Sequence, residues 1–524
     1  MRLGRRQFVA RAASLAALFP AACSDVSQLA HEYDVIIVGG GSAGCVLARR
    51  LTDNPNTQVL LIEAGGPAQH PALNSGLKWF SMLGSDLAYP DMTLPQASLG
   101  GKQIFAAHGR ALGGSSVINA MIHHWPAAAD IDQWNVPGWG WADIQPMLAA
   151  SETYLDGPSP GRGTQGPIGV MRLPDPPALT DAALEAAQAR GFGMIEDINS
   201  GSQIGAAHNQ LAFADGMRQH TGLAYLEPVG ARRNLTVMVG AQAAGLILSG
   251  QSCNGVIVES KEGPRRIGAG RTVLSAGALR TPQLLMLSGI GPADHLRSLE
   301  IDVALDQPAI GANLHDHLLF SGNNFAATGS GASEYHGSAA VLYASSGQGR
   351  RDILCNISTN ARVFPPLESA DSGFKTSFSF TKPHSRGVLR LVNKDPAKQP
   401  LLDHRFLSDE RDVVGALAAL DTSRSLLSHS AFSRFDAKEL NQDMLSTPDG
   451  RRAFLNASAT SFGHHCGTCA MGIEAADPVA PDLSLRGIKG LSVMDASILP
   501  SIPSSPTNAL VVAMAELAAQ RLAA

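Results

Sequence analysis

A glycine-rich turn between a short apolar strand and a helix lies near the start of the chain, and it constrains the fold more than any other feature. Residues 33–38 are mostly apolar and β-branched, as is typical of a buried parallel strand. The sequence GGGSAG follows at 39–44, and residues 45–51 have helical spacing of apolar side chains. A second apolar strand at 58–62 ends at Glu63. Together these segments predict the βαβ start of a doubly wound α/β domain.

Gly39, Gly41 and Gly44 form the G-x-G-x-x-G pattern of dinucleotide-binding domains. The first glycine permits the tight turn, the second lets the backbone approach a pyrophosphate, and the third lets helix and strand pack closely. The helix N-terminus offers N–H groups and its positive dipole end to the phosphates. Glu63 can accept hydrogen bonds from both ribose hydroxyls, and its charge disfavours a 2′-phosphate. The pattern therefore predicts an unphosphorylated adenine dinucleotide, either NAD or FAD.

Composition excludes several other classes of protein. A chain of 524 residues predicts two or more domains at about 100–200 residues each. Only 16% of the residues are charged, which excludes an intrinsically disordered chain, and the 54 glycines have no Gly-X-Y period, which excludes collagen. The net charge of −5, with no basic block, argues against nucleic-acid binding. No run of 18 apolar residues indicates a membrane-spanning helix.

The N-terminus predicts export. Arg5 and Arg6 precede an apolar stretch at 12–22 that is too short to span a bilayer. This arrangement resembles a twin-arginine signal, the route for proteins that are exported already folded, so we expect residues 1–30 to be signal and linker and the protein to be periplasmic. A disordered basic tail is the alternative. Cys23 ends the stretch as in a lipoprotein processing site, but the usual leucine three positions earlier is missing, so a lipid anchor stays open.

Six cysteines are too few for a disulfide scaffold in a chain of this length. The sequence HHCGTC at 464–469 combines two imidazoles with a C-x-x-C pair. Adjacent residues rarely point at one ion, and the chain has no second cysteine pair, so we expect no metal site there.

Several later segments bear on the fold and the ligand. Small residues cluster at 109–119, which suits a backbone pressed against a flat ligand. Residues 271–277 predict another buried strand, and residues 281–289 predict a helix with Pro282 in its first turn. An amphipathic helix is expected around 409–428.

These motifs together resemble the glucose–methanol–choline (GMC) family of flavin oxidoreductases, and the resemblance extends from Tyr33 to the C-terminus. Residues 109–119 are similar to the first family signature, and residues 277–291 fit the second. The sequence NLHDH at 313–317 is similar to the family's Asn-Leu-x-Asp-His, and residues 490–500 resemble its flavin-contacting turn. The set is far more specific than any single motif.

The resemblance implies FAD as the dinucleotide and a fold of two parts. We expect a discontinuous Rossmann-type FAD-binding domain of α/β class, made of residues 33–125, 210–320 and 460–524. A second, α+β substrate-binding domain, built on an antiparallel sheet, would comprise residues 126–209 and 321–459.

Some family members link FAD covalently through a histidine just before the signature asparagine, and here that position is Ile118, so we expect non-covalent FAD. His123 departs from the signature, which has an aromatic residue or alanine at that position. The cofactor-binding residues that we expect are Gly39, Gly41, Ser42, Ala43, Gly44, Glu63, Gly113, Gly114, Asn119, Ile122, Ala243, Asp495, Ala496 and Ala509.

The resemblance also implies a reacting pair. The family base is a histidine three residues before Gly-Thr, which is His464 in this chain, and a second His or Asn 43–44 residues later is Asn508. Alcohol oxidation removes the hydroxyl proton while hydride leaves carbon for flavin N5, and an imidazole suits the proton transfer. Asn508 can hold the alkoxide oxygen, and we expect it to be the N-cap of a helix at 509–522 whose positive end faces the flavin.

We therefore expect FAD-dependent oxidation of a small-molecule alcohol, by a dehydrogenase rather than an oxidase. The electron acceptor stays open among a quinone, a cytochrome and oxygen. A FAD-containing hydroxynitrile lyase and a light-driven decarboxylase share the fold and are the alternatives. A flavoprotein without enzymatic activity is a third class.

Overall fold

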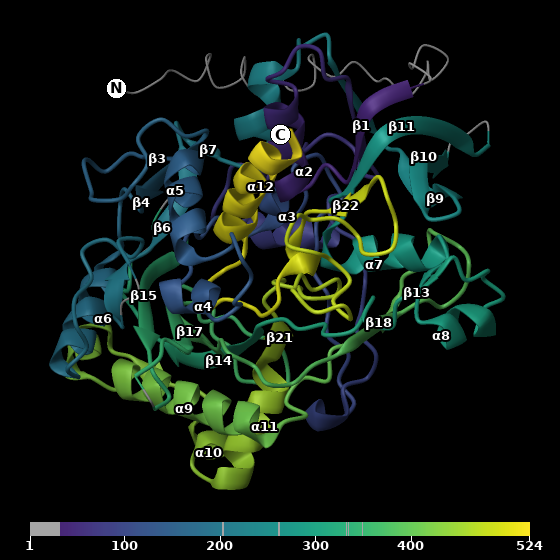
Figure 1. Ribbon diagram of the computed structural model, residues 1–524. Coiled ribbons are helices and arrows are strands. Elements are labelled where there is room, and N and C mark those ends of the chain that lie inside the picture. Colours follow the sequence, from purple (N-terminus) through teal and green to yellow (C-terminus); the bar gives the residue numbers. More distant parts are fainter. Residues whose placement is uncertain are drawn as a thin grey trace.

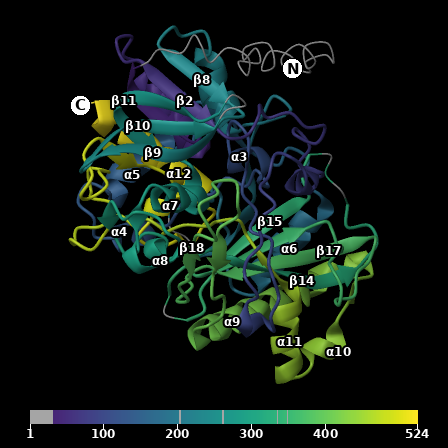
Figure 2. The same cartoon turned by 90° about the vertical axis from the view of Figure 1, so that its right-hand side faces the viewer.

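Two lobes, each built around one sheet, make up this computed structural model (Figures 1 and 2). The structure describes residues 32–201, 204–259, 263–331, 333, 335–347 and 349–523. The predicted export signal and Cys23 lie outside the described residues. Strand β1 (Glu32–Val38) and helix α12 (Asn508–Ala523) belong to the same lobe, so the two ends of the described chain meet there.

The first sheet carries the predicted βαβ start. Strand β1 pairs in parallel with β2 (Val59–Glu63) and β11 (Arg265–Leu274), and α2 (Ser42–Leu51) connects β1 to β2. The strand order is β8-β2-β1-β11-β10-β9, with β8 (Leu235–Val239), β9 (Gln242–Ser249), β10 (Ser252–Glu259) and, paired with β11, β22 (Leu491–Val493). The register aligns Val38 with Ile62 and with Leu274. The carboxyl ends of three parallel strands therefore share one edge, where a doubly wound sheet binds its ligand.

The second sheet is antiparallel throughout its described pairs. Its order is β20-β14-β17-β16-β15-β5, and its strands are β5 (Gly205–His208), β14 (Leu318–Ala326), β15 (Ser338–Ala344), β16 (Ile353–Ser358), β17 (Gly373–Phe380), β20 (Lys438–Glu439) and, paired with β14, β21 (Ala459–Ser461). Helices α6 (Ala178–Ala189), α9 (Glu410–Leu427) and α11 (Pro448–Ser458) cover the face away from the first lobe (Figures 1 and 2). Phe320 and Phe378 stack beneath these helices, with ring centroids 5.4 Å apart.

Shorter elements complete the described chain. The remaining helices are α3 (Ser115–Ile118), α4 (Ala128–Asp132), α5 (Trp141–Ser151), α7 (Gly277–Leu287), α8 (Ala293–Ser298) and α10 (Gln442–Leu445), with shorter helical turns η2 (Trp79–Gly84), η3 (Ala97–Leu99), η4 (Gly222–Leu226), η5 (Glu227–Val229), η6 (Ser430–Phe435) and η7 (Ala496–Ile498). The described chain also has three small sheets. One has the strand order β3 (Glu152–Tyr154), β4 (Ile168–Arg172), β6 (Gln210–Ala214) and β7 (Met217–Arg218). The other two pair β12 (Ile290–Gly291) with β13 (Leu305–Asp306) and β18 (Val388–Arg390) with β19 (Leu401–Asp403).

The predicted fold class is confirmed, with a Rossmann-type parallel sheet in one lobe and an antiparallel sheet with helices in the other. Among the described residues, no helix has both the length and the apolar character that crossing a membrane would need.

The start of helix α7 differs from its prediction. Helix α7 begins at Gly277, four positions earlier than expected, so Pro282 lies inside it and not in its first turn. A proline inside a helix removes the N–H that would bond to the carbonyl four residues earlier, here that of Ala278. The Thr468 hydroxyl donates to the Ala278 carbonyl at 2.6 Å instead. A tertiary contact therefore compensates for the proline.

Candidate active site

A cavity of about 1100 Å³ lies between the two lobes and is lined by residues from both. Both predicted catalytic residues, His464 and Asn508, line it. So do most of the predicted cofactor residues, namely Gly39, Gly41, Ser42, Ala43, Glu63, Gly114, Asn119, Ile122, Ala243, Asp495 and Ala496. Gly44, Gly113 and Ala509 lie behind this lining. The site is thus assembled from segments that are hundreds of residues apart in the sequence.

The turn after β1 has the shape that a bound pyrophosphate needs. Gly39 has a φ of +104°, and a Cβ there would lie 2.4 Å from the Ser275 carbonyl oxygen. A Cβ on Gly44 would lie 1.9 Å from the Gly39 carbonyl oxygen, which is the close helix–strand contact predicted for the third glycine. At Gly41, the N-cap of α2, a Cβ would meet no protein atom closer than 3.9 Å and would project into the cavity. These residues fit the pyrophosphate of a dinucleotide.

Glu63 is held at the end of β2 by two backbone donors. Its Oε2 accepts the N–H of Gly40 at 2.8 Å, and its Oε1 accepts the N–H of Gly65 at 2.7 Å. Burial raises the pKa of Glu63 to about 7, and the two backbone donors oppose that rise. Each carboxylate oxygen keeps a second lone pair for a ribose hydroxyl. The carboxylate therefore fits the ribose of the predicted dinucleotide.

The second glycine loop packs against the first. The N–H of Gly113 donates to the carbonyl of Gly40 at 2.7 Å, which explains why Gly113 lies behind the cavity wall. Asn119 follows α3 on that wall and is fixed by Arg218, whose Nη1 donates to the backbone and side-chain oxygens of Asn119, both at 2.7 Å. Sequence reasoning missed Arg218, because nothing in its own segment points to a partner about a hundred residues away.

Arg218 is buried, and no carboxylate lies within ion-pair distance of it among the described residues. Burial lowers the pKa of Arg218 to about 9. A buried cation that bonds only to neutral oxygens is costly. Its position therefore makes the wall at Asn119 electropositive.

Asp495 and Ala496 lie where β22 leads into the turn η7. The Asp495 carboxylate accepts the N–H of Gly277 at 2.9 Å, the hydroxyl of Thr281 at 2.6 Å and the N–H of Ser497 at 2.8 Å. This carboxylate ties the start of α7 to the C-terminal turn.

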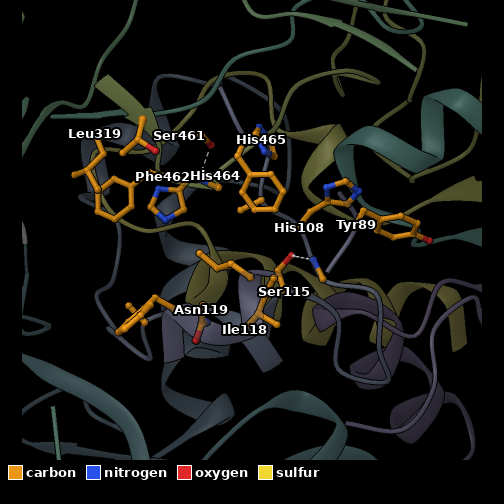
Figure 3. A pocket seen from close by; sticks show the side chains of 18 of the residues that line it. Tyr89, His108, Ser115, Ile118, Asn119, Leu319, Ser461, Phe462, His464 and His465 are labelled. Carbon is orange, nitrogen blue, oxygen red and sulfur yellow. Dashed lines mark hydrogen bonds between the residues drawn. The ribbon is translucent and has the colours of Figure 1, made fainter. Parts of the chain in front are cut away.

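His464 follows β21 and faces α3 across the cavity. In Figure 3, His464 and Phe462 lie on one wall, and Ile118 and Asn119 lie on the opposite wall. The rings of Phe462 and His464 stack, with centroids 4.4 Å apart and an interplanar angle of 21°. The backbone N–H of His464 donates to the Asp316 carboxylate at 2.7 Å. Both contacts restrict the position of the imidazole.

A second histidine determines which nitrogen of His464 carries a proton. Nε2 of His317 lies 3.0 Å from the Thr381 carbonyl oxygen, and this oxygen can only accept, so Nε2 of His317 carries the proton. Burial lowers the pKa of His317 to about 4, so the ring is neutral at neutral pH and its Nδ1 is an acceptor. Nδ1 of His464, at 2.9 Å, then donates to it. His464 therefore keeps an unprotonated Nε2. His317 belongs to the NLHDH motif, which was the signal that could have revealed this role.

The pKa of His464 lies well below the ordinary value of 6.5. Burial is the main cause of the lowered pKa, and the neighbouring His317 and His465 add to it. His464 is therefore neutral at neutral pH and able to accept a proton.

Asn508 is the first residue of α12 and not its N-cap, so the helix begins one residue earlier than predicted. Its Oδ1 accepts the hydroxyl of Ser42, from the start of α2, at 2.7 Å. This leaves the amide N–H₂ group as the part of Asn508 that can donate to a ligand. The N-termini of two helices, α2 and α12, therefore meet at the cavity.

Asp316, His404 and His465 are the described residues whose side chains group closely enough to hold a metal ion. Nε2 of His404 lies 3.1 Å from Nδ1 of His465, which lies 3.4 Å from Oδ2 of Asp316. One hydrogen bond, between His404 and His465, and the contact of His465 with Asp316 link these three buried side chains. Cys466 and Cys469, which sequence reasoning weighed as ligands, are buried and outside it.

Comparisons with known proteins agree with this geometry. Models of the GMC oxidoreductase family match residues 33–319 and 383–515. A pyridoxine 4-oxidase of Microbacterium luteolum is 33% identical over 93% of this chain and 98% of its own length. An oxygen-dependent choline dehydrogenase of Brucella suis is 31% identical over 94% and 95%. The crystal structure of a pyridoxine 4-oxidase from "Mesorbium loti" superposes with a TM-score of 0.89 at 32% identity, covering 93% of this chain and 98% of that one. On this evidence, the chain belongs to the GMC oxidoreductase family.

Proposed function

We propose that this protein oxidises an alcohol with non-covalently bound FAD, and that His464 is the general base. The observation that carries the proposal is the pair of hydrogen bonds that fixes His317 and His464 and leaves Nε2 of His464 unprotonated at the cavity. Relatives named as a pyridoxine 4-oxidase and as an oxygen-dependent choline dehydrogenase support the reaction class. When bound, FAD supplies the two-electron acceptor, taking hydride at N5.

Nε2 of His464 takes the proton of the substrate hydroxyl. The stacked ring of Phe462 and the bond to His317 hold the imidazole in one orientation, so little reorganisation is needed when the proton moves. The low pKa of His464 keeps the base neutral before reaction. The proton is transferred within the site while the carbon loses hydride.

Asn508 holds the oxygen from which the proton leaves. Its amide N–H₂ group donates to the developing alkoxide, while its carbonyl stays bonded to Ser42. The N-terminus of α12 adds a positive dipole end on the same side of the cavity, which favours negative charge developing there.

Three finer properties belong to the proposal. FAD is non-covalent, because Ile118 occupies the position of the linking histidine in covalently flavinylated family members. The protein is a dehydrogenase rather than an oxidase. This is tested by comparing the rate of oxygen uptake with the rate at which an artificial electron acceptor is reduced. It is exported through a twin-arginine signal at residues 1–30, which a double substitution of Arg5 and Arg6 by lysine should prevent.

The decisive experiment is anaerobic mixing of the flavin-loaded protein with a panel of alcohols. We expect the flavin to bleach with at least one of them, and His464→Ala to slow bleaching by about 10²–10⁴-fold while FAD content is unchanged. His208→Ala, a histidine outside the cavity lining, is the matched control. Bleaching at the wild-type rate in His464→Ala would refute the base. Cyanohydrin cleavage without bleaching would indicate a lyase, and light-dependent release of carbon dioxide a decarboxylase.

Release of the flavin tests the mode of binding separately. Acid precipitation should leave a colourless pellet and all of the FAD in the supernatant. Colour that stays with the pellet would show a covalent bond.

A further inference from the structure

The part of the cavity that faces the second sheet is polar. Side chains alternate along β17, so Phe374 and Phe378 enter the core while Lys375 and Ser377 line the cavity. The hydroxyl of Ser377 donates to the Ser321 hydroxyl on the neighbouring strand β14 at 3.1 Å. Further polar lining residues from the same face are Ser338, Asn356 and Ser358. This face forms a floor of hydroxyl and amide groups, which we call the polar floor.

Lys375 is the charged residue of the polar floor. Its Nζ donates to the carbonyl of Arg362 at 2.7 Å, which uses one of three donors. No carboxylate lies within ion-pair distance of Nζ among the described residues. Burial lowers the pKa of Lys375 to about 8, as expected for a cation without a counter-charge.

The other charges of the lining do not neutralise Lys375. Asp371 lies at the rim, is almost fully exposed, and pairs with Arg362 at 3.2 Å. Glu63 and Asp495 are on the cofactor side and bond to backbone donors there. Lys102, also in the lining, donates to three backbone carbonyls, those of Asn456, Ala457 and Ala459. The substrate side of the cavity therefore carries an excess of positive charge.

Strand register gives the spacing between Lys375 and the reacting end. Phe378 pairs with Phe320, which is next to Leu319. Figure 3 places Leu319 beside Phe462, the residue stacked on His464. Lys375 is three residues from Phe378 along β17, and Leu319 lies one position beyond the partner of Phe378. Four residues at about 3.4 Å each place the Lys375 backbone roughly 14 Å from the level of Leu319. Because a lysine side chain is long and flexible, its ammonium can meet a group at the end of an elongated substrate remote from the reacting hydroxyl.

We infer that the substrate is an elongated alcohol that carries an anionic oxygen group, a carboxylate or a phosphate, at the end remote from the hydroxyl, and that Lys375 binds this group. The inference rests on the proposed function and names its substrate class. An anion satisfies the free donors of Lys375 and supplies the missing counter-charge. A quaternary ammonium at the same end meets an uncompensated cation, so choline-like alcohols fit this chain poorly.

Rigid biphenyls provide the test, because their length is fixed. Three para,para′-substituted hydroxymethyl-biphenyls, bearing a carboxylate, a carboxamide or a trimethylammonium group, are mixed anaerobically with the flavin-loaded protein, and the dissociation constant is taken from the concentration dependence of bleaching. We expect the carboxylate to bind at least 10-fold more tightly than the carboxamide and the trimethylammonium compound to bind most weakly. An analogue with a phosphate in place of the carboxylate shows which of the two anionic groups binds more tightly.

Lys375→Met should abolish the preference for carboxylate over carboxamide, leave carboxamide binding within about 2-fold, and leave flavin content unchanged. Lys375→Arg should keep the preference. Lys394→Met, at an exposed lysine paired with Glu300, is the matched control. Equal binding of carboxylate and carboxamide by the wild type would overturn the inference. Equally weaker binding of the carboxylate and the carboxamide by Lys375→Met would also overturn the inference. It would show that Lys375 only stabilises the loop at Arg362 through its hydrogen bond to that carbonyl.

Non-oxidisable methyl-biphenyls with the same end groups separate this inference from the proposed function. Their binding is read from the shift of the flavin absorbance at equilibrium, without turnover. A carboxylate preference that depends on Lys375, together with no bleaching by any alcohol, would refute alcohol oxidation and leave the anion site standing.

Discussion

The two walls of the cavity differ in what forms them, since one is made of backbone and the other of side chains. The cofactor wall is made largely of backbone, at glycines such as Gly39 in the lining and Gly44 directly behind it, where a Cβ would lie within 2.4 Å of a carbonyl oxygen. The substrate wall is made of side chains such as Ser377 and Lys375, which project from an antiparallel sheet. A backbone wall admits almost no substitution, whereas a side-chain wall can change while its sheet keeps the same register. The difference teaches that one fold can keep its cofactor and change its substrate.

The largest effect should come from the backbone wall. Gly44→Ala places a Cβ 1.9 Å from the Gly39 carbonyl oxygen, so helix α2 must move away from β1. We expect almost complete loss of bound flavin and destabilisation by more than about 3 kcal/mol. Flavin absorbance of the purified protein and its melting temperature measure both. Gly84→Ala, where a Cβ meets nothing within 4 Å, is the control and should behave as wild type. Full flavin content in Gly44→Ala would contradict the statement that the backbone wall admits almost no substitution.

The next effect concerns the positioning of the base. His317→Leu removes the acceptor for Nδ1–H of His464, so the imidazole loses its fixed tautomer and orientation. We expect the rate of flavin reduction to fall on the order of 10–100-fold with flavin content unchanged. His317→Asn keeps an acceptor near the position of Nδ1 and should recover most of the rate. Equal rates in the two variants would show that His317 only fills space.

The pH dependence of flavin reduction tests the role of His464 as the base. His464 must be neutral to accept a proton, and its pKa lies well below 6.5. The rate of flavin reduction should therefore stay constant as the pH falls from neutrality to 6.5 and decline only as the pH falls further, through the pKa of His464. A wild-type decline that begins above pH 6.5 would contradict this assignment.

The smallest effect should come from the substrate wall. Ser377→Ala removes one hydrogen bond to Ser321 and leaves the rest of the sheet intact. We expect a loss of about 1 kcal/mol or less and an unchanged flavin content. Phe378→Ala, the adjacent residue on the core face of the same strand, should cost about 3–5 kcal/mol. Chemical denaturation measures the free energy of unfolding of the two variants. Similar losses of stability in both would show that the substrate wall does not tolerate substitution.

The cofactor wall could be predicted because its determinants are local in sequence. Gly39, Gly41 and Gly44 lie within one turn, and Glu63 follows at the end of the next strand. The strand–turn–helix pattern therefore predicted the fold of this lobe, and the later family motifs at 109–119, 277–291, 313–317 and 490–500 predicted its place in the GMC family. The structure places most of the residues named from this pattern and from the family motifs on the cavity wall.

The remainder of the site depends on contacts between distant segments. Arg218 acts on Asn119, His317 acts on His464, and both pairs are separated by about a hundred residues or more. The helix boundary at α7 was wrong for the same reason, since the carbonyl left free by Pro282 is satisfied by Thr468 from another part of the chain. Local propensity carries no information about such partners.

The sequence alone determined the dinucleotide turn and the fold class of this lobe, because the close approach of backbone to backbone admits only glycine at a few fixed positions. Its later motifs together determined the family. Only the tertiary structure decided which nitrogen of His464 is unprotonated and that Lys375, which has no carboxylate partner among the described residues, lines the cavity. Proton placement and local charge depend on partners brought together by folding, since both are set by hydrogen bonds and burial rather than by residue type.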